Sequence, residues 1–313
     1  MSKKTDLCKT VSAEELSELY ASYDQKKLKK IFKKEGRKIK SLPPLDRVSP
    51  YIMVERNAAS NMFCDKLHME KIDDYIHRKQ KEGYPDFSLM HVLVAAYIRT
   101  VSQRPGINRF IRGQRPWARN HVEVCLTIKK EMTRESPETV IKAYFGPDAT
   151  AEDVYREFDA IVKNYRNTPG GDFDNAAKFF HFIPGVFLKF VLFIIKMFDY
   201  FGWLARFLTW LSPFHGSMFI TSMGSLGIPP IYHHLYDLGN VPIFISFGAK
   251  YRKNEIEDDG SIKKHTYVDY TVVMDERICD GFYYASAFRY MKGIFRNPSV
   301  LDSRPETIVE DIK

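Results

Sequence analysis

The segment 273–282 constrains the fold of this chain more than any other part of the sequence. It begins in the apolar run that ends an expected strand over 266–274, and it continues with a short acidic and basic turn. An Asp-Gly pair then opens a segment with the apolar spacing of a helix. A strand, a charged turn and a helix are therefore expected to follow one another directly in this part of the chain.

Elsewhere the apolar spacing predicts further helices and strands in mixed order. Helices are expected over 69–82, 87–103 and 150–167, and strands over 121–128, 217–223 and 242–248. With 313 residues, 44% of them hydrophobic, the chain is long enough for one large globular domain or two small ones.

Asp280 and Gly281 complete a resemblance to the active-site motif His-x-x-x-Asp-Gly of the chloramphenicol acetyltransferase and dihydrolipoamide acyltransferase superfamily, with Glu276 where the family has its histidine. Four other parts of the chain resemble family segments in the same order. They are the run 87–96 with 104–108, the segment 216–227, the strand-like run 241–248 and the closing helix over 288–298. The resemblance covers residues from about 45 to 300. It implies an α/β fold, a chloramphenicol acetyltransferase-like two-layer sandwich with a mixed sheet and helices on one face.

The resemblance also implies transfer of an acyl group from a coenzyme A thioester, with a base that deprotonates the acceptor. Glu276 would be that base. A thiol has a reference pKa of about 8.5, a histidine about 6.5 and a glutamate about 4.3, so the carboxylate is poorer by roughly 3 kcal/mol, about a hundredfold, unless burial raises its pKa. Two functions stay open: an acyltransferase using acyl-CoA, and an inactive relative that binds acyl-CoA or acts as a membrane-associated scaffold.

Thr221 aligns with a family serine whose hydroxyl hydrogen-bonds the tetrahedral oxyanion, and threonine keeps that hydroxyl. In the family, the base of one subunit faces this hydroxyl of its neighbour. The resemblance therefore implies a homotrimer whose catalytic sites join Glu276 of one chain to Thr221 of the next. His233 and His234 follow Pro229-Pro230 and offer an alternative imidazole base, or they are surface or packing residues.

Three residues beside Glu276 are expected to be structural at the site. In the family, the aspartate at the position of Asp280 pairs with an arginine and holds the loop of the base. Arg277 follows the family pattern, and Arg56 is another possible partner. Gly281 is expected to allow a close turn before the last helix.

Positive charge is concentrated near the N-terminus. Nine residues from Lys26 to Lys40 are Lys or Arg and one is acidic, so this window alone carries a charge equal to the net charge of +8. The rest of the chain is close to neutral, which argues against a nucleic-acid surface over the whole domain. The basic window either binds anionic lipid or is a solvated helix.

Three parts of the chain are expected. A basic helical extension, 1–42, contains a helix over 12–35 that begins at a capping-box pattern. Pro43-Pro44 then separates it from an acyltransferase-like domain, 43–313. Within that domain, 172–214 forms a hydrophobic helical insertion that the family does not have.

The insertion is rich in aromatic residues. Eleven Phe or Trp side chains lie within 179–211, and a helix is expected to begin at Pro184-Gly185. Lys189 and Lys196 are seven residues apart, which places them on one face of this helix. Three interpretations stay open: a cap buried against the protein or a partner subunit, a helix in the interface of an anionic membrane, and a transmembrane span. The last would need roughly 18 or more residues with few or no charges.

The four cysteines favour a reducing compartment. Cys8, Cys64, Cys125 and Cys279 are scattered without the spacing of a zinc site or a disulfide framework, so no metal is expected. No apolar N-terminal stretch suggests a secretory signal. The expected location is the cytoplasm, with peripheral binding to the inner face of the membrane as an option.

Overall fold

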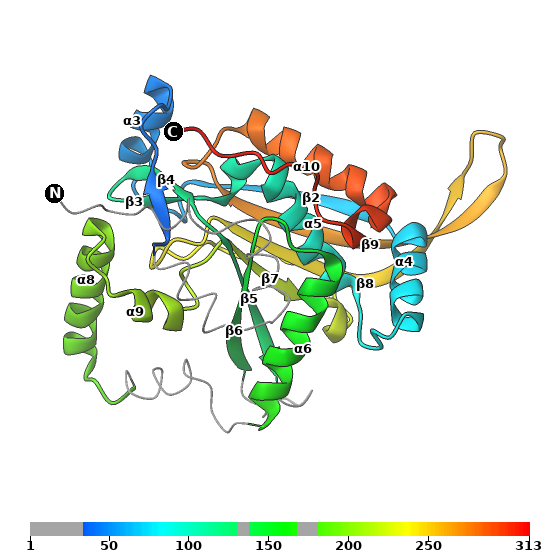
Figure 1. The fold of residues 1–313 in the computed structure, drawn as a ribbon, viewed down its shortest axis with the longest axis horizontal. Helices are drawn as coiled ribbons and strands as arrows, with labels where there is room; N and C mark the ends of the chain where they lie inside the picture. Colours follow the sequence, from blue (N-terminus) through cyan, green and yellow to red (C-terminus); the bar gives the residue numbers. More distant parts are fainter. Residues whose placement is uncertain (1–33, 130–137, 168–180) are drawn as a thin grey trace.

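The computed structural model describes residues 34–129, 138–167 and 181–313 (Figure 1). The expected helix over 12–35 lies outside these ranges, apart from its last two positions. From Glu35 onward the chain packs on the folded body, because Glu35, Ile39 and Leu42 are buried.

A six-stranded mixed sheet is the centre of the fold. Its outer pairs are antiparallel, whereas the short central strand is parallel to both of its neighbours. In spatial order the strands are β2 (Ser60–His68), β9 (Ile262–Asp275), β8 (Ile243–Ile256), β7 (Met218–Ser222), β5 (Val122–Lys129) and β6 (Glu138–Phe145).

Helices cover one face of this sheet (Figure 1). They are α4 (Glu70–Lys81), α5 (Leu89–Gln103), α6 (Ala151–Asn167) and α10 (Gly281–Arg296). The most deeply buried is α5, and Ser88 with His91 forms a reciprocal capping box at its start. Residues alternate along the strands, so that Ile220 and Ile245 join the core under the helices, whereas Phe219 and Phe244 point to the other side.

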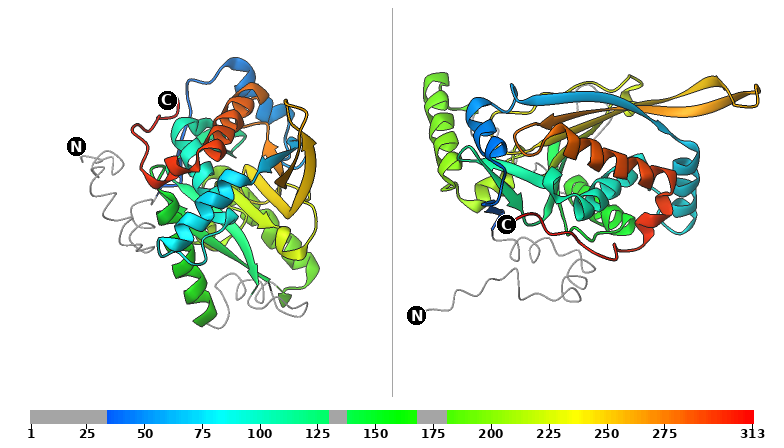
Figure 2. Two further views of the ribbon diagram at one scale, coloured as in Figure 1. Left: turned by 90° about the vertical axis from the view of Figure 1, so that its right-hand side faces the viewer. Right: turned by 90° about the horizontal axis from the view of Figure 1, so that it is seen from above.

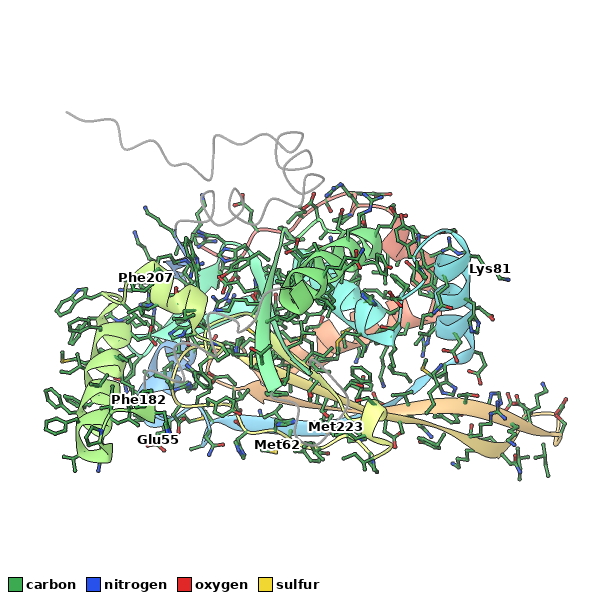
Figure 3. The ribbon with its side chains drawn as sticks, turned by 90° about the horizontal axis from the view of Figure 1, so that it is seen from below. Glu55, Met62, Lys81, Phe182, Phe207 and Met223 are labelled. Carbon is green, nitrogen blue, oxygen red and sulfur yellow. The ribbon has the colours of Figure 1, made fainter. Side chains whose placement is uncertain are left out.

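The sheet face that carries Phe219, Phe244 and Val273 is here called the second face. Leu235 and Val241, from the irregular segment 227–242, pack on it. Figure 3 shows the two sides of the sheet, with Met62 and Met223 on the side turned away from the helices. The expected two-layer arrangement, a mixed sheet with helices on one face, is confirmed.

A second, three-stranded sheet lies beside the first. It consists of β1 (Gly36–Lys38), β4 (Arg115–Arg119) and β3 (Arg109–Arg112), and α3 (Pro44–Ile52) adjoins it. The short helical turns are η2 (Pro105–Asn108), η3 (Gly224–Leu226) and η4 (Pro298–Asp302).

Within 181–214, the part of the expected insertion that the structure describes, two helices are found, α8 (Gly185–Phe201) and α9 (Arg206–Leu211). Gly202 ends α8 with a φ of 72°, a left-handed conformation that favours glycine. These helices lie at one end of the molecule, and the long β8–β9 hairpin projects from the other end (Figures 1 and 2). Among the described helices, none is both long enough and apolar enough to cross a bilayer.

Candidate functional site

The turn after β9 is fixed by a buried carboxylate. Asp275 is 1% exposed and accepts two hydrogen bonds from the Arg277 guanidinium, each at 2.8 Å. The Arg56 Nε atom lies 3.4 Å from the second carboxylate oxygen of Asp275. One carboxylate is therefore shared by two buried arginines, and its geometry with Arg277 is bidentate.

The two arginines connect this turn to its surroundings. Arg277 also donates to the Val54 carbonyl at 2.8 Å, and Arg56 donates to the carbonyls of Tyr236 and Gly239. The turn is thus tied to the segment after α3 and to the irregular segment 227–242. Its backbone has little freedom to move.

Glu276 lies at the tip of this rigid turn and is exposed. Its backbone N–H donates to the Ala59 carbonyl at 2.9 Å, which fixes the main chain next to the start of β2. Within the part of the chain that the structure describes, the Glu276 carboxylate has no hydrogen bond or ion pair. The expected base is therefore presented to solvent from a fixed support.

The prediction that Asp280 pairs with Arg277 or Arg56 is wrong. Asp280 is exposed and caps α10, since its Oδ1 atom accepts from the Tyr283 backbone N–H at 2.7 Å. The buried arginines pair with Asp275 instead, because Asp275 lies at the end of a strand whose side chains point into the body. Asp280 and Arg277 both remain structural, but in separate interactions.

The expected role of Gly281 is also wrong. It is the first residue of α10, its φ is not positive, and a Cβ atom built there would have no heavy atom within 4 Å. No close turn requires glycine at this position.

Thr221 lies on the second face, near the end of β7, and is half-buried. The strand register places it opposite Ser246, which is opposite Thr271. These three side chains form a row of hydroxyls across β7, β8 and β9. Ser246 and Thr271 are buried and hydrogen-bond the Ile231 backbone, whereas Thr221 is half-buried, so Thr221 is the member of the row best placed to donate to a ligand oxygen at this face.

Glu276 and Thr221 are far apart within one chain. In the strand register, Thr221 on β7 is level with Thr271 on β9, two strands away. Thr271 precedes Glu276 by five residues. With about 3.3 Å per residue and about 4.8 Å between strands, the separation is on the order of 15–20 Å. One copy of the chain therefore does not bring these two residues to the same reacting atom.

His233 is brought onto the second face and His234 is not. The His233 ring stacks on Phe244 at 4.2 Å between centroids, and Phe244 stacks in turn on Phe219. Burial and the neighbouring His234 lower the pKa of His233. His234 is exposed, with its ring edge-on to Tyr236 at 6.2 Å. His233 is thus a packing residue in this chain, one row along the sheet from Thr221.

The segment with His233 is held close to the sheet by two contacts. The Thr271 hydroxyl donates to the Ile231 carbonyl at 2.6 Å. Gly248 allows Pro230 to approach, since a Cβ atom at Gly248 would lie 2.6 Å from Pro230 Cδ. Among the described residues, no group of three or more His, Cys, Asp or Glu side chains could hold a metal ion.

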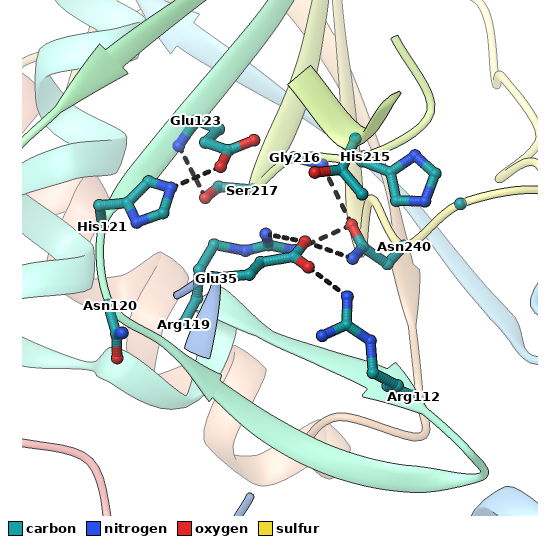
Figure 4. Close-up of polar contacts among 12 residues, drawn as sticks. Glu35, Arg112, Arg119, Asn120, His121, Glu123, His215, Gly216, Ser217 and Asn240 are labelled. Atoms are coloured by element: carbon teal, nitrogen blue, oxygen red, sulfur yellow. Dashed lines mark hydrogen bonds and ion pairs between the residues drawn. The ribbon is translucent and has the colours of Figure 1, made fainter. Parts of the chain in front are cut away.

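A buried ionic cluster, which the sequence interpretation missed, lies where the small sheet meets β5 (Figure 4). Its first half surrounds Glu35, whose carboxylate contacts Arg112 and is 2.8 Å from Arg119. Asn240 donates to the same carboxylate, and its own oxygen accepts from Arg119 at 3.0 Å. Burial raises the pKa of Glu35, but Arg119 and Arg112 outweigh this effect and hold the pKa far below its usual range.

The second half of the cluster surrounds Glu123 on β5. The Glu123 carboxylate contacts His121 and lies 2.7 Å from Arg206 of α9 and 3.6 Å from Lys142. Burial raises the pKa of Glu123, but the charges around it, with Lys142 the largest, hold the pKa well below its usual range. The signal was present in the sequence, because His121 and Glu123 alternate with valines on the expected strand.

These two carboxylates predict acid sensitivity. A carboxyl group with a lowered pKa in the folded state stabilises the protein above its unfolded pKa of about 4.5, and this contribution is lost as the pH falls further. The free energy of unfolding, measured by urea titration, should therefore fall steadily below pH 4.5. Glu35→Gln should flatten that dependence, whereas Glu306→Gln, at an exposed glutamate, should not. Equal slopes for the two variants would contradict the role of Glu35.

No protein-family model and no curated protein matches the sequence. Solved structures do match. A probable dihydrolipoamide acetyltransferase from Listeria monocytogenes 4b F2365 gives a TM-score of 0.54 at 13% identity, over 82% of this chain and 94% of that chain. The cubic core of the pyruvate dehydrogenase multienzyme complex gives a TM-score of 0.54 at 10% identity, over 84% of this chain and 93% of that chain.

A third structure is the dihydrolipoamide acetyltransferase of Azotobacter vinelandii, studied for the role of a serine, a histidine and an asparagine in its catalytic mechanism. It gives a TM-score of 0.53 at 9% identity, over 84% of this chain and 93% of that chain. At such identities the likeness establishes the fold, and it does so over nearly the whole length of these proteins.

Proposed function

We propose that this chain, which has the fold of the chloramphenicol acetyltransferase and dihydrolipoamide acyltransferase superfamily, transfers an acyl group from a coenzyme A thioester to a thiol or hydroxyl acceptor. The site is shared between copies of the chain, with Glu276 from one and Thr221 from its neighbour. The observation that carries the proposal is the exposed Glu276 side chain on a turn locked by buried ion pairs.

Three further observations support the proposal. Glu276 and Thr221 are too far apart to act together within one chain. In the Azotobacter enzyme, the histidine and asparagine under study are four residues apart, as are Glu276 and Asp280 here. One of the similar structures forms the cubic core of a multienzyme complex, which is consistent with self-association of this fold.

The proposed reaction has two steps. The Glu276 carboxylate takes the proton of the acceptor while the acceptor sulfur or oxygen forms a bond to the thioester carbonyl carbon. The Thr221 hydroxyl donates a hydrogen bond to the resulting oxyanion, an interaction often worth about 2.7–4 kcal/mol. The intermediate then collapses, the carbon–sulfur bond breaks, and the coenzyme A thiolate takes the proton back from Glu276.

One observation favours a second candidate function, the binding of acyl-CoA without transfer. A carboxylate becomes a base strong enough for a thiol chiefly through burial, and Glu276 is exposed in the single chain. An interface that does not bury Glu276 would leave a binder with very slow turnover.

The release of free coenzyme A thiol separates the two functions. Purified protein is mixed with acetyl-CoA or a longer acyl-CoA and a panel of thiol and alcohol acceptors. Acyl transfer predicts release of free coenzyme A, measured by chromatography because a thiol acceptor leaves the total thiol unchanged, that depends on the acceptor and is lost in Glu276→Gln. Saturable acyl-CoA binding with no acceptor-dependent release, for any member of the panel, would support the binder and contradict the transferase.

A shared site also predicts a trimer. Light scattering of the purified chain should give a mass three times that of the 36.5 kDa chain, because each site needs a neighbour and three copies close the ring. A monomer at micromolar concentration would remove the shared-site mechanism.

A further inference from the structure

The outer side of α8 is apolar and uncovered. Val186, Phe190, Phe193 and Phe201 are between 55% and 82% exposed. Their spacing places them on one face of the helix, here called the apolar stripe. No residue of α8 is fully buried, and so many large apolar side chains on a protein surface mark a binding face.

The basic and acidic residues of α8 lie on different sides of the helix. Its two lysines, Lys189 and Lys196, are exposed and lie along one flank of the apolar stripe. Its one acidic residue, Asp199, faces the body of the protein, with its carboxylate 3.4 Å from His215 and 3.8 Å from Arg112. The outer surface of the helix is therefore apolar with a positive border.

The helix is attached to the body at its C-terminal end. Besides the contacts of Asp199, the Tyr200 hydroxyl donates to the side-chain oxygen of Gln114 on the β3–β4 turn at 3.2 Å. Arg206 of α9 anchors the following segment to Glu123 in the buried ionic cluster. These polar contacts hold α8 in place without using the apolar stripe.

More apolar and basic side chains lie at the same end of the molecule. Phe182 and Phe207 are exposed there, as Figure 3 shows. Trp203 is 66% exposed and stacks on Phe201. The small sheet that receives the end of α8 exposes Lys38 on β1 and Arg115 on β4. An aromatic surface with a basic surround is the pattern of a helix that lies in a membrane interface.

We propose that α8 docks the protein on an anionic lipid bilayer, with the apolar stripe at the level of the upper acyl chains and Lys189 and Lys196 at the headgroups. With 17 residues the helix is about 26 Å long, so it fits along the surface. The docking is independent of the proposed acyl transfer and does not involve Glu276 or Thr221.

A lipid surface fits α8 better than a second copy of the chain does. The core of a protein–protein interface is depleted in lysine, whereas Lys189 and Lys196 directly border the apolar stripe. Among the described residues neither lysine has an acidic partner, so both charges remain available to lipid phosphates.

Co-sedimentation of the full chain with vesicles tests the docking. Vesicles of phosphatidylcholine with phosphatidylserine are compared with vesicles of phosphatidylcholine alone. The native protein should sediment with the anionic vesicles at low salt and be released at high salt. The double change Phe190→Asp with Phe193→Asp should leave it in the supernatant. Ile256→Asp is the control, an apolar residue that is even more exposed and lies on the hairpin at the opposite end, and it should sediment like the native protein.

Replacing the two lysines of α8 tests their contribution to vesicle binding quantitatively. Lys189→Gln with Lys196→Gln should weaken partitioning to anionic vesicles roughly thirtyfold, at about 1 kcal/mol per basic residue. These are surface changes, so circular dichroism should show an unchanged fold. Native protein that stays in the supernatant at low salt would overturn the proposal, as would lysine variants that bind like the native protein. A drop in the mass of the Phe190→Asp, Phe193→Asp variant in light scattering would instead assign α8 to a contact between copies.

Discussion

Replacing Glu276 by histidine is expected to raise the rate of acyl transfer about a hundredfold. The reference pKa of histidine is about two units closer to that of a thiol than the pKa of glutamate is, which corresponds to roughly 3 kcal/mol in the proton-transfer step. Turnover is measured as the release of coenzyme A thiol at saturating acyl-CoA.

Glu276→Gln is the matched control, because it keeps the shape of the side chain and removes the base. It should lose transfer, and the melting temperatures of both variants should match that of the native protein, since surface changes usually alter stability by less than about 0.5 kcal/mol. A Glu276→Gln variant as active as the native chain would rule out Glu276 as the base.

Asp275→Ala should lower the free energy of unfolding by about 3–5 kcal/mol, the usual cost of leaving a buried charge without its partner. Asp275 is the shared partner of Arg277 and Arg56, both of which are at most 6% exposed. Chemical denaturation of the purified variant measures the loss.

Asp280→Ala is the comparison that gives this prediction its specificity. It removes an N-cap from α10 and should cost only about 0.5–2 kcal/mol. If the two variants lost the same stability, or if Asp280→Ala lost more, the arginines would have to depend on Asp280, contrary to the contacts seen here.

The resemblance to the acyltransferase family implied the architecture, and the strong apolar periods of the core located several of its helices and strands. The expected helix over 87–103 is α5, and the expected strand over 242–248 is the inner part of β8. The edge strand β2 was not anticipated. It alternates between exposed and half-buried positions and includes Asp65, Lys66 and His68, so its apolar period is weak.

The site was less accessible to sequence interpretation because its ion pairs depend on where the chain folds back. Asp275, Arg277 and Asp280 are close in sequence, and a pattern alone does not show which acid points inward. The structure shows it: Asp275 is the last residue of β9, on the same face as Val273, whereas Asp280 lies beyond the turn.

The buried ionic cluster was also missed, because its residues are distant from one another in the sequence. Glu35, Glu123 and Asn240 are far apart along the chain, so the sequence did not show that they meet. A partial sign was the alternation of His121 and Glu123 with valines on the expected strand, because a buried charge needs a partner.

The most direct measurement of the central claim, a site shared between copies, is complementation between two inactive variants. Glu276→Gln chains lack the base, and Thr221→Val chains lack the oxyanion donor. Equal amounts of the two variants are unfolded together and refolded, so that they assort at random into trimers. A complete site then forms at about a quarter of the interfaces, where a native Glu276 of one chain faces a native Thr221 of its neighbour. A shared site predicts that release of coenzyme A returns to about a quarter of the native rate, although each variant alone stays inactive. A mixture that forms mixed trimers and remains as inactive as its two components would contradict it.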